Sequence, residues 1–115
     1  MPTLTSTAWF IIGALAAGIG VTLGAFGAHG LKSRVTADLL VIFETGVRYQ
    51  MYHAFGLIAV AWAASKWGNA LINAAGWSFV IGTLIFSGSL YLLTLTGLRK
   101  LGAVTPIGGV AFILG

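Results

Sequence analysis

Nine polar side chains of this chain have the chemistry to form a functional site, although most of the sequence around them is apolar. Two of them, His29 and His53, carry imidazoles suited to proton transfer, hydrogen bonding or metal ligation. The full candidate cluster is His29, Glu44, Arg48, Tyr49, Gln50, His53, Ser87, Ser89 and Tyr91. Polar groups in hydrocarbon surroundings are costly unless they are paired, so such a cluster is a candidate functional site.

The two histidines leave several kinds of chemistry open. They come from different apolar runs and are the minimum set for bis-imidazole ligation of haem, provided that they lie at one depth. A quinone head group held by histidine and tyrosine donors is a second alternative. The third is plain helix packing, because Tyr49 and Gln50 precede His53 by four and three residues and share a helical face with it.

The remaining cluster residues fit structural roles. Glu44 and Arg48 are spaced i, i+4 with the acid first, which predicts an ion pair within one helix at the membrane edge. Ser87 and Ser89 can bond across helices or to carbonyls of the preceding turn. We therefore predict no catalytic residue, no metal-ligand set and no cofactor.

The composition excludes a soluble globule. Only 7% of residues are charged, 58% are hydrophobic, and the mean hydropathy is +1.00, whereas a soluble domain carries about 25% charged residues. The absence of cysteine excludes disulfides, thiolate zinc sites and iron–sulfur clusters. The net charge of +4 comes from six Lys and Arg residues set between apolar runs, which is typical of membrane loops and does not indicate a nucleic-acid partner.

The runs predict an all-α, integral membrane four-helix bundle that forms a single domain over residues 1–115. A helix of about 20 residues crosses the hydrocarbon core, and the expected spans are about 8–28, 47–64, 70–93 and 103–115. Residues 32–46 mix charged and apolar positions and predict an amphipathic helix lying in the membrane interface. The last span would reach only about 20 Å, so we expect the natural chain to continue beyond Gly115.

The first run has a competing interpretation as a cleaved signal peptide, but no Lys or Arg precedes it. Basic residues of membrane proteins are retained on the cytoplasmic side. The second connection holds Lys66 alone, whereas the first and third hold Lys32, Arg34, Arg48, Arg99 and Lys100. The chain is therefore expected to be a multi-pass protein of the cytoplasmic (inner) membrane with both termini outside and the polar cluster in one shallow layer on the inner side.

Small residues predict where the helices pack, because they allow backbones in lipid to approach closely. Gly20 and Gly24 form a GxxxG pair, for which packing within one chain is favoured over dimerisation. The complete set of expected packing glycines is Gly20, Gly24, Gly27, Gly82, Gly88, Gly108 and Gly109.

Four motifs in order carry a resemblance to a known family. They are GAFGAHGL at 24–31, ETGVRYQMYHAFGL at 44–57, FSGSLYLL at 86–93 and TPIGGVAFILG at 105–115. Together they resemble the small membrane-protein family catalogued as domain of unknown function 423, whose eukaryotic relatives include transmembrane protein 256. The resemblance implies a four-helix membrane protein without an agreed activity, and it supplies no catalytic residues.

The leading functional hypothesis is a non-enzymatic accessory or assembly partner of a membrane complex. One alternative is a small proton or solute transporter or channel, and another is a quinone- or haem-binding membrane subunit. The expected partners are the lipid bilayer and either another membrane protein or further copies of the chain, with no nucleic acid.

Overall fold

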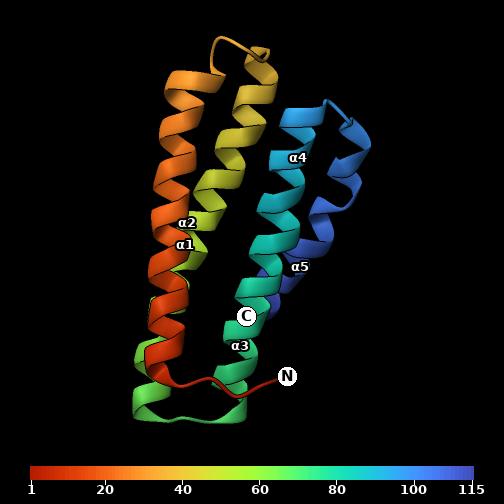
Figure 1. The fold of residues 1–115 in the computed structure, drawn as a ribbon. Helices are drawn as coiled ribbons and strands as arrows, with labels where there is room; N and C mark the ends of the chain where they lie inside the picture. The colour runs from red at the N-terminus through yellow and green to blue at the C-terminus, as the bar shows by residue number, and fades with distance from the viewer.

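The computed structural model describes all residues, 1–115, and it is entirely helical. In chain order the elements are α1 (Ser6–Phe26), the π-helical turn η1 (Gly27–Leu31), α2 (Ala37–Lys66), α3 (Ala70–Gly82), the π-helical turn η2 (Thr83–Ser87), α4 (Gly88–Thr96), the 3₁₀ helix η3 (Arg99–Ala103) and α5 (Thr105–Leu114). Each π-turn continues its neighbouring α-helices, so these elements make four helical rods side by side (Figure 1). The molecule is elongated, with extents of 46 × 27 × 17 Å.

Local chemistry sets the helix ends. The Thr5 hydroxyl accepts a hydrogen bond from the Ala8 N–H at 3.1 Å, and the Asn69 side chain accepts one from the Ile72 N–H at 3.1 Å, so both act as N-caps. Helix α4 ends at Gly97, whose φ of 73° is left-handed and therefore suits glycine.

Helix α2 corrects the expected division between an interfacial helix at 32–46 and a second span at 47–64. It runs without a break for 30 residues, about 45 Å, and the segment before residue 47 supplies its first turns. Phe43 is 1% exposed and Gly46 is buried. Phe43 and Gly46 therefore pack against other helices of the same chain, whereas Val41 is 59% exposed.

Helix α2 is also the centre of the bundle, because it contacts α1 along its length and α3, η2 and α4 on another side. Gly20 and Gly24 of α1 and Gly27 of η1 lie in the contact with α2. A Cβ at Gly27 would lie 3.1 Å from the Phe43 ring, and one at Gly24 would lie 3.4 Å from Val47. A Cβ at Gly20 would lie 2.5 Å from the Met51 sulfur.

Helix α5 packs on α3 and η2 through a second group of glycines. A Cβ at Gly82 would lie 2.5 Å from the Phe112 ring, and one at Gly108 would collide with the backbone nitrogen of Phe86. Gly109 leaves an ordinary contact distance of 3.8 Å to the Phe86 ring.

Gly88 contradicts the expected packing role, since a Cβ there would meet nothing within 4 Å. The expectation came from the six-residue spacing of Gly76, Gly82 and Gly88. At about 100° per residue, six residues turn a helix by about 240°, so these glycines face different neighbours.

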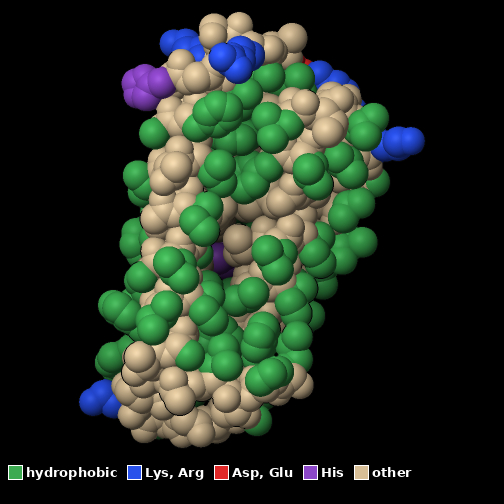
Figure 2. Space-filling model, viewed as in Figure 1, with side chains coloured by type: hydrophobic (Ala, Val, Ile, Leu, Met, Phe, Trp, Pro, Cys, Tyr) green, Lys and Arg blue, Asp and Glu red, His purple; other side chains and the backbone are tan.

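Two helical segments, Ser6–Leu31 and Ala70–Thr96, are long and apolar enough to cross a membrane. Only 17% and 33% of their most apolar windows are buried, unlike the core helix of a soluble protein. On the face shown in Figure 2, Lys and Arg side chains gather at the two ends and hydrophobic side chains cover the region between them. Helices α2 and α5 are not among these segments. Helix α2 carries charged side chains, and α5 has only 10 residues.

The N-terminal residues form a strap from α1 to α3 (Figure 1). The Pro2 carbonyl accepts hydrogen bonds from Asn73 Nδ2 at 2.9 Å and from Trp77 Nε1 at 2.7 Å, and the Leu4 N–H donates to Asn73 Oδ1 at 3.0 Å. Next to the strap, the fully buried Trp9 stands against α2 and α3. The strap therefore ties two rods together at the end opposite Lys32.

Candidate functional site

A polar junction in the interior joins three of the four rods. Gln50 of α2 is only 5% exposed. Its Nε2 donates to the Ala16 carbonyl of α1 at 2.8 Å, and its Oε1 accepts from the Tyr91 hydroxyl of α4 at 2.6 Å. The Tyr91 ring can reach α2 because it lies over Gly46, where a Cβ would be 2.8 Å from it. The Gln50 carbonyl oxygen, one Gln50 N–H and the Tyr91 hydroxyl are therefore all paired with protein groups.

The serines of the candidate cluster bond across helices as well. The fully buried Ser87 donates to the Gly46 carbonyl at 2.6 Å, and Ser89 shares a 2.6 Å hydrogen bond with Thr105 at the start of α5. The π-turn η2 ends at Ser87, and π-turns are frequent at functional sites. Among buried side-chain polar atoms, only Trp9 Nε1 lacks a partner.

His53 makes its contacts with other residues than Gln50 does. Its Nδ1 is 2.7 Å from the Tyr49 carbonyl, and because a carbonyl only accepts, Nδ1 is the donor of this hydrogen bond. The imidazole stacks on the Phe112 ring with centroids 3.5 Å apart and meets the Phe79 ring edge-on at 5.2 Å. Aromatic packing and one backbone bond therefore hold this side chain, and Gln50 takes no part.

The two histidines do not share a layer, which corrects the expectation that they lie at similar depth. Gly27 lies level with Phe43, and His53 is ten residues further along α2, about 15 Å away. His29 is exposed in η1, on the other side of the Gly27 level. The two purple side chains in Figure 2 accordingly lie at different heights. The two imidazoles of one chain therefore cannot ligate the same haem iron.

Glu44 and Arg48 do not form the expected ion pair. Arg48 Nη2 donates to the Thr45 hydroxyl at 3.2 Å instead, and both charged side chains are exposed. The only ion pair of the chain joins Asp38 to Arg99 at 2.6 Å, between the start of α2 and η3. An exposed i, i+4 pair is worth only a few tenths of a kcal/mol, so a neighbouring hydroxyl is a sufficient competitor.

The carboxyl of Asp38 lies at the charged end, outside the two apolar segments. The hydrogen bond from Thr36, followed by the one from Arg99, lowers the pKa of Asp38 from 3.8 to about 2. This carboxylate therefore stays ionised at physiological pH. No three His, Asp or Glu side chains of the chain lie close enough together to hold a metal ion.

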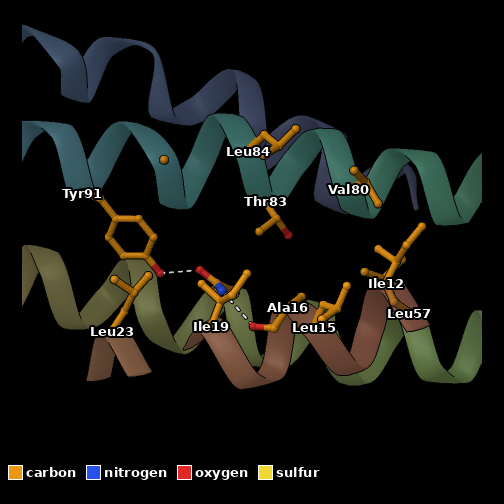
Figure 3. Close-up of a pocket in the computed structure, with 12 residues that line it drawn as sticks. Ile12, Leu15, Ala16, Ile19, Leu23, Leu57, Val80, Thr83, Leu84 and Tyr91 are labelled. Carbon is orange, nitrogen blue, oxygen red and sulfur yellow. Dashed lines mark hydrogen bonds between the residues drawn. The ribbon is translucent and has the colours of Figure 1, made fainter. Parts of the chain in front are cut away.

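Beside the junction, a groove of about 420 Å³ opens between α1 and the α3–α4 rod (Figure 3). Its walls are mainly aliphatic side chains such as Ile12, Ile19 and Leu84, and Gln50 and Tyr91 line it as well. It exists because α1 and the α3–α4 rod pack on α2 without packing extensively on each other.

Comparison with known proteins assigns the chain to a family. The model of the family described as "Protein of unknown function (DUF423)" matches residues 23–109. The chain belongs to this family. A DUF423 relative from Bacillus subtilis, "UPF0382 membrane protein YwdK", is 50% identical over 92% of this chain and 87% of its own length.

Two staphylococcal relatives are similarly close. "UPF0382 membrane protein SSP2132" of Staphylococcus saprophyticus is 48% identical over 93% of this chain and 88% of its own, and "UPF0382 membrane protein SH2409" of Staphylococcus haemolyticus is 47% identical over 93% and 87%. No solved structure matches the chain. This DUF423 chain is thus a membrane protein of a family of unknown function, and the three bacterial relatives carry no enzymatic name.

Sequence reasoning missed several groups of this DUF423 fold. The Ala16 carbonyl carries no side-chain signal, and Thr83, which lines the groove, is one threonine among many. Asn73 was detectable, because an amide in an apolar run needs a partner. It finds that partner in the N-terminal strap.

Proposed function

We propose that this protein is a non-enzymatic accessory subunit of a membrane complex, which docks on a partner helix through the outer face of α1. One observation carries the proposal. Ala14, Gly18 and Thr22 follow one another at one-turn spacing on this face, and all three are exposed. These residues are called the α1 strip below.

The α1 strip has the properties of a helix-docking surface. A Cβ at Gly18 would meet nothing within 4 Å, so the backbone is open to a neighbour. The Thr22 hydroxyl donates to the Gly18 carbonyl at 2.9 Å and presents no free donor. Helices in lipid associate where small residues let backbones approach, and α1 has α2 as its only extensive neighbour within the chain.

The interior supports a structural role over transport. Ion or proton conduction needs polar or ionisable groups that follow one another across the bundle. Here Gln50, Tyr91, Ser87 and Ser89 are each bonded to other protein groups. The adjacent groove is lined mainly by apolar side chains.

We further propose an orientation in the cytoplasmic membrane, with the four rods along the membrane normal. The end that carries Lys32, Arg34, Arg99 and Lys100 is placed on the cytoplasmic side, because basic loops are retained there. The N-terminal strap and Lys66 are then outside.

A crosslinking experiment tests the proposal, since the chain has no cysteine. G18C would be labelled with a maleimide-benzophenone in native membranes and irradiated. Phe55, which is 60% exposed on α2 near the same depth, gives the control F55C. We expect one discrete heavier adduct from G18C and none from F55C, and Gly18→Leu should abolish co-purification of that partner.

Two outcomes would contradict this function. An adduct of twice the chain's mass would assign the α1 strip to self-association. Lipid adducts alone, equal at both positions, would leave the chain solitary and remove the docking surface.

A further inference from the structure

The groove between α1 and the α3–α4 rod contains a hydroxyl that the fold leaves unpaired. Thr83 begins η2, lines the groove and points into it from the α3–α4 side (Figure 3). Four other helical threonines, Thr22, Thr45, Thr94 and Thr96, donate to the carbonyl four residues earlier. Thr83 makes no such bond, and no other group of the chain bonds to it.

An unpaired hydroxyl at this depth calls for a partner. Thr83 lies near the middle of the apolar segment Ala70–Thr96, where water is absent and an unsatisfied polar group is costly. The printed bonds of Gln50 and Tyr91 go to each other and to Ala16, and none of them reaches Thr83. A molecule that fills the groove can supply the partner.

The dimensions of the groove select a thin occupant. Its α1 wall extends from Ile12 to Leu23, eleven residues or about 16 Å. A volume of about 420 Å³ over that length gives a mean cross-section of about 26 Å², against roughly 80 Å² for a helix 10 Å across. The groove is too thin for a transmembrane helix. At roughly 30 Å³ for each water-sized group, it holds about 14 such groups, which is the size of a substituted ring with its first isoprene unit.

We propose that this groove binds a prenyl quinone, with Thr83 donating its hydroxyl proton in a hydrogen bond to a quinone carbonyl. Phospholipids and fatty acids carry their polar atoms at the membrane surface, so their chains would leave Thr83 unpaired. A quinone is uncharged and carries carbonyl acceptors on a ring that enters hydrocarbon. The aliphatic wall of Ile12, Ile19 and Leu84 suits a methyl-branched isoprenoid tail. The proposal concerns binding alone and extends beyond the docking role of α1.

The test measures binding to the whole chain in lipid nanodiscs by titration calorimetry. The probes are a benzoquinone with a short isoprenoid tail and an isoprenoid hydrocarbon of equal length. Thr83→Val keeps the side-chain shape and removes the hydroxyl. Gly88→Leu fills the groove, which Gly88 lines, and Gly18→Leu is the matched control, because a Cβ at either glycine meets nothing within 4 Å.

We expect Thr83→Val to weaken quinone binding about three- to tenfold, the value of one net hydrogen bond. Gly88→Leu should weaken it more than tenfold, while Gly18→Leu leaves it unchanged. The hydrocarbon should bind the wild type more weakly than the quinone does and should not distinguish Thr83→Val from the wild type.

Three outcomes would overturn the proposal. Unchanged quinone affinity in both Thr83→Val and Gly88→Leu would place binding elsewhere. Equal affinity of the two probes for the wild type would assign the groove to an ordinary acyl chain. Absence of saturable quinone binding to a wild type that unfolds cooperatively would exclude the site altogether.

Discussion

Two adjacent glycines of α5 allow a sharp test of the packing. At Gly108 an added Cβ would collide with the Phe86 backbone nitrogen and lie 2.8 Å from its Cα. Backbone atoms cannot rotate away, so α5 must move. At Gly109 the nearest atoms belong to the Phe86 ring, 3.8 Å away, which is an ordinary contact. Gly108→Ala and Gly109→Ala are therefore the same chemical change in two different environments.

The expected difference follows from two effects. Alanine is favoured over glycine inside a helix by about 1 kcal/mol, and both variants gain this equally. Overpacking a close contact costs about 1–3 kcal/mol, and only Gly108→Ala incurs it. Gly109→Ala should be neutral or up to about 1 kcal/mol more stable than wild type, and Gly108→Ala should be about 1–3 kcal/mol less stable than Gly109→Ala.

Unfolding by SDS in mixed micelles, followed by far-UV circular dichroism, measures this difference. Amide hydrogen exchange of residues 105–114 then shows whether the loss is local to α5, which would lose protection in Gly108→Ala only. Equal stability of the two variants, or a more stable Gly108→Ala, would refute the close approach of α5 to η2.

Three further predictions follow from contacts described above. Tyr91→Phe and Gln50→Leu should show a coupling free energy of about 0.5–2 kcal/mol in a double-mutant cycle, and strict additivity would argue against their bond. Gly76→Ala places a Cβ 2.6 Å from the buried Trp9 ring and should lower the free energy of unfolding in SDS by about 1–3 kcal/mol. An unchanged free energy of unfolding would contradict this packing. The Asp38 carboxyl, followed by NMR in micelles, should titrate near pH 2, and Arg99→Gln should raise its pKa towards 3.8. Because folding lowers this pKa, its stabilisation is present above about pH 4 and is lost as the pH falls towards 2; a wild-type midpoint near 4 would contradict the contact.

The apolar runs of the sequence locate two of the rods well. The expected spans at about 8–28 and 70–93 coincide with the two segments that are long and apolar enough to cross a membrane. Such runs can be recognised in a sequence because a helix surrounded by lipid needs apolar side chains on all sides. The second span was expected to start at residue 47, whereas α2 starts at Ala37. The amphipathic pattern of residues 32–46 is the same whether its apolar face contacts lipid or protein, so the sequence could not distinguish the two.

The misplaced start of α2 explains why His53 was expected at the same depth as His29. Moving the start of α2 from residue 47 to Ala37 shifts His53 by ten residues along the bundle, away from His29. Gln50 and Tyr91 were both singled out by sequence, but their pairing across helices depends on the rotation of each rod. Thr83 stands at the start of the π-turn η2, and sequence periodicity reveals neither such a turn nor which threonine hydroxyl is left open.

The strap from Pro2 and Leu4 to Asn73 has a consequence for how the groove can change width. It pins α1 to α3 at one end, and part-way along the groove Gln50 links Ala16 of α1 to Tyr91 of α4. The two walls are therefore held at the strap and at Gln50, and the stretch of the groove beyond Gln50, towards the Lys32 end, is the least constrained. A long lipophile would enter from that end, while the first five residues, despite their remoteness from Thr83, would fix the separation of the walls at the other.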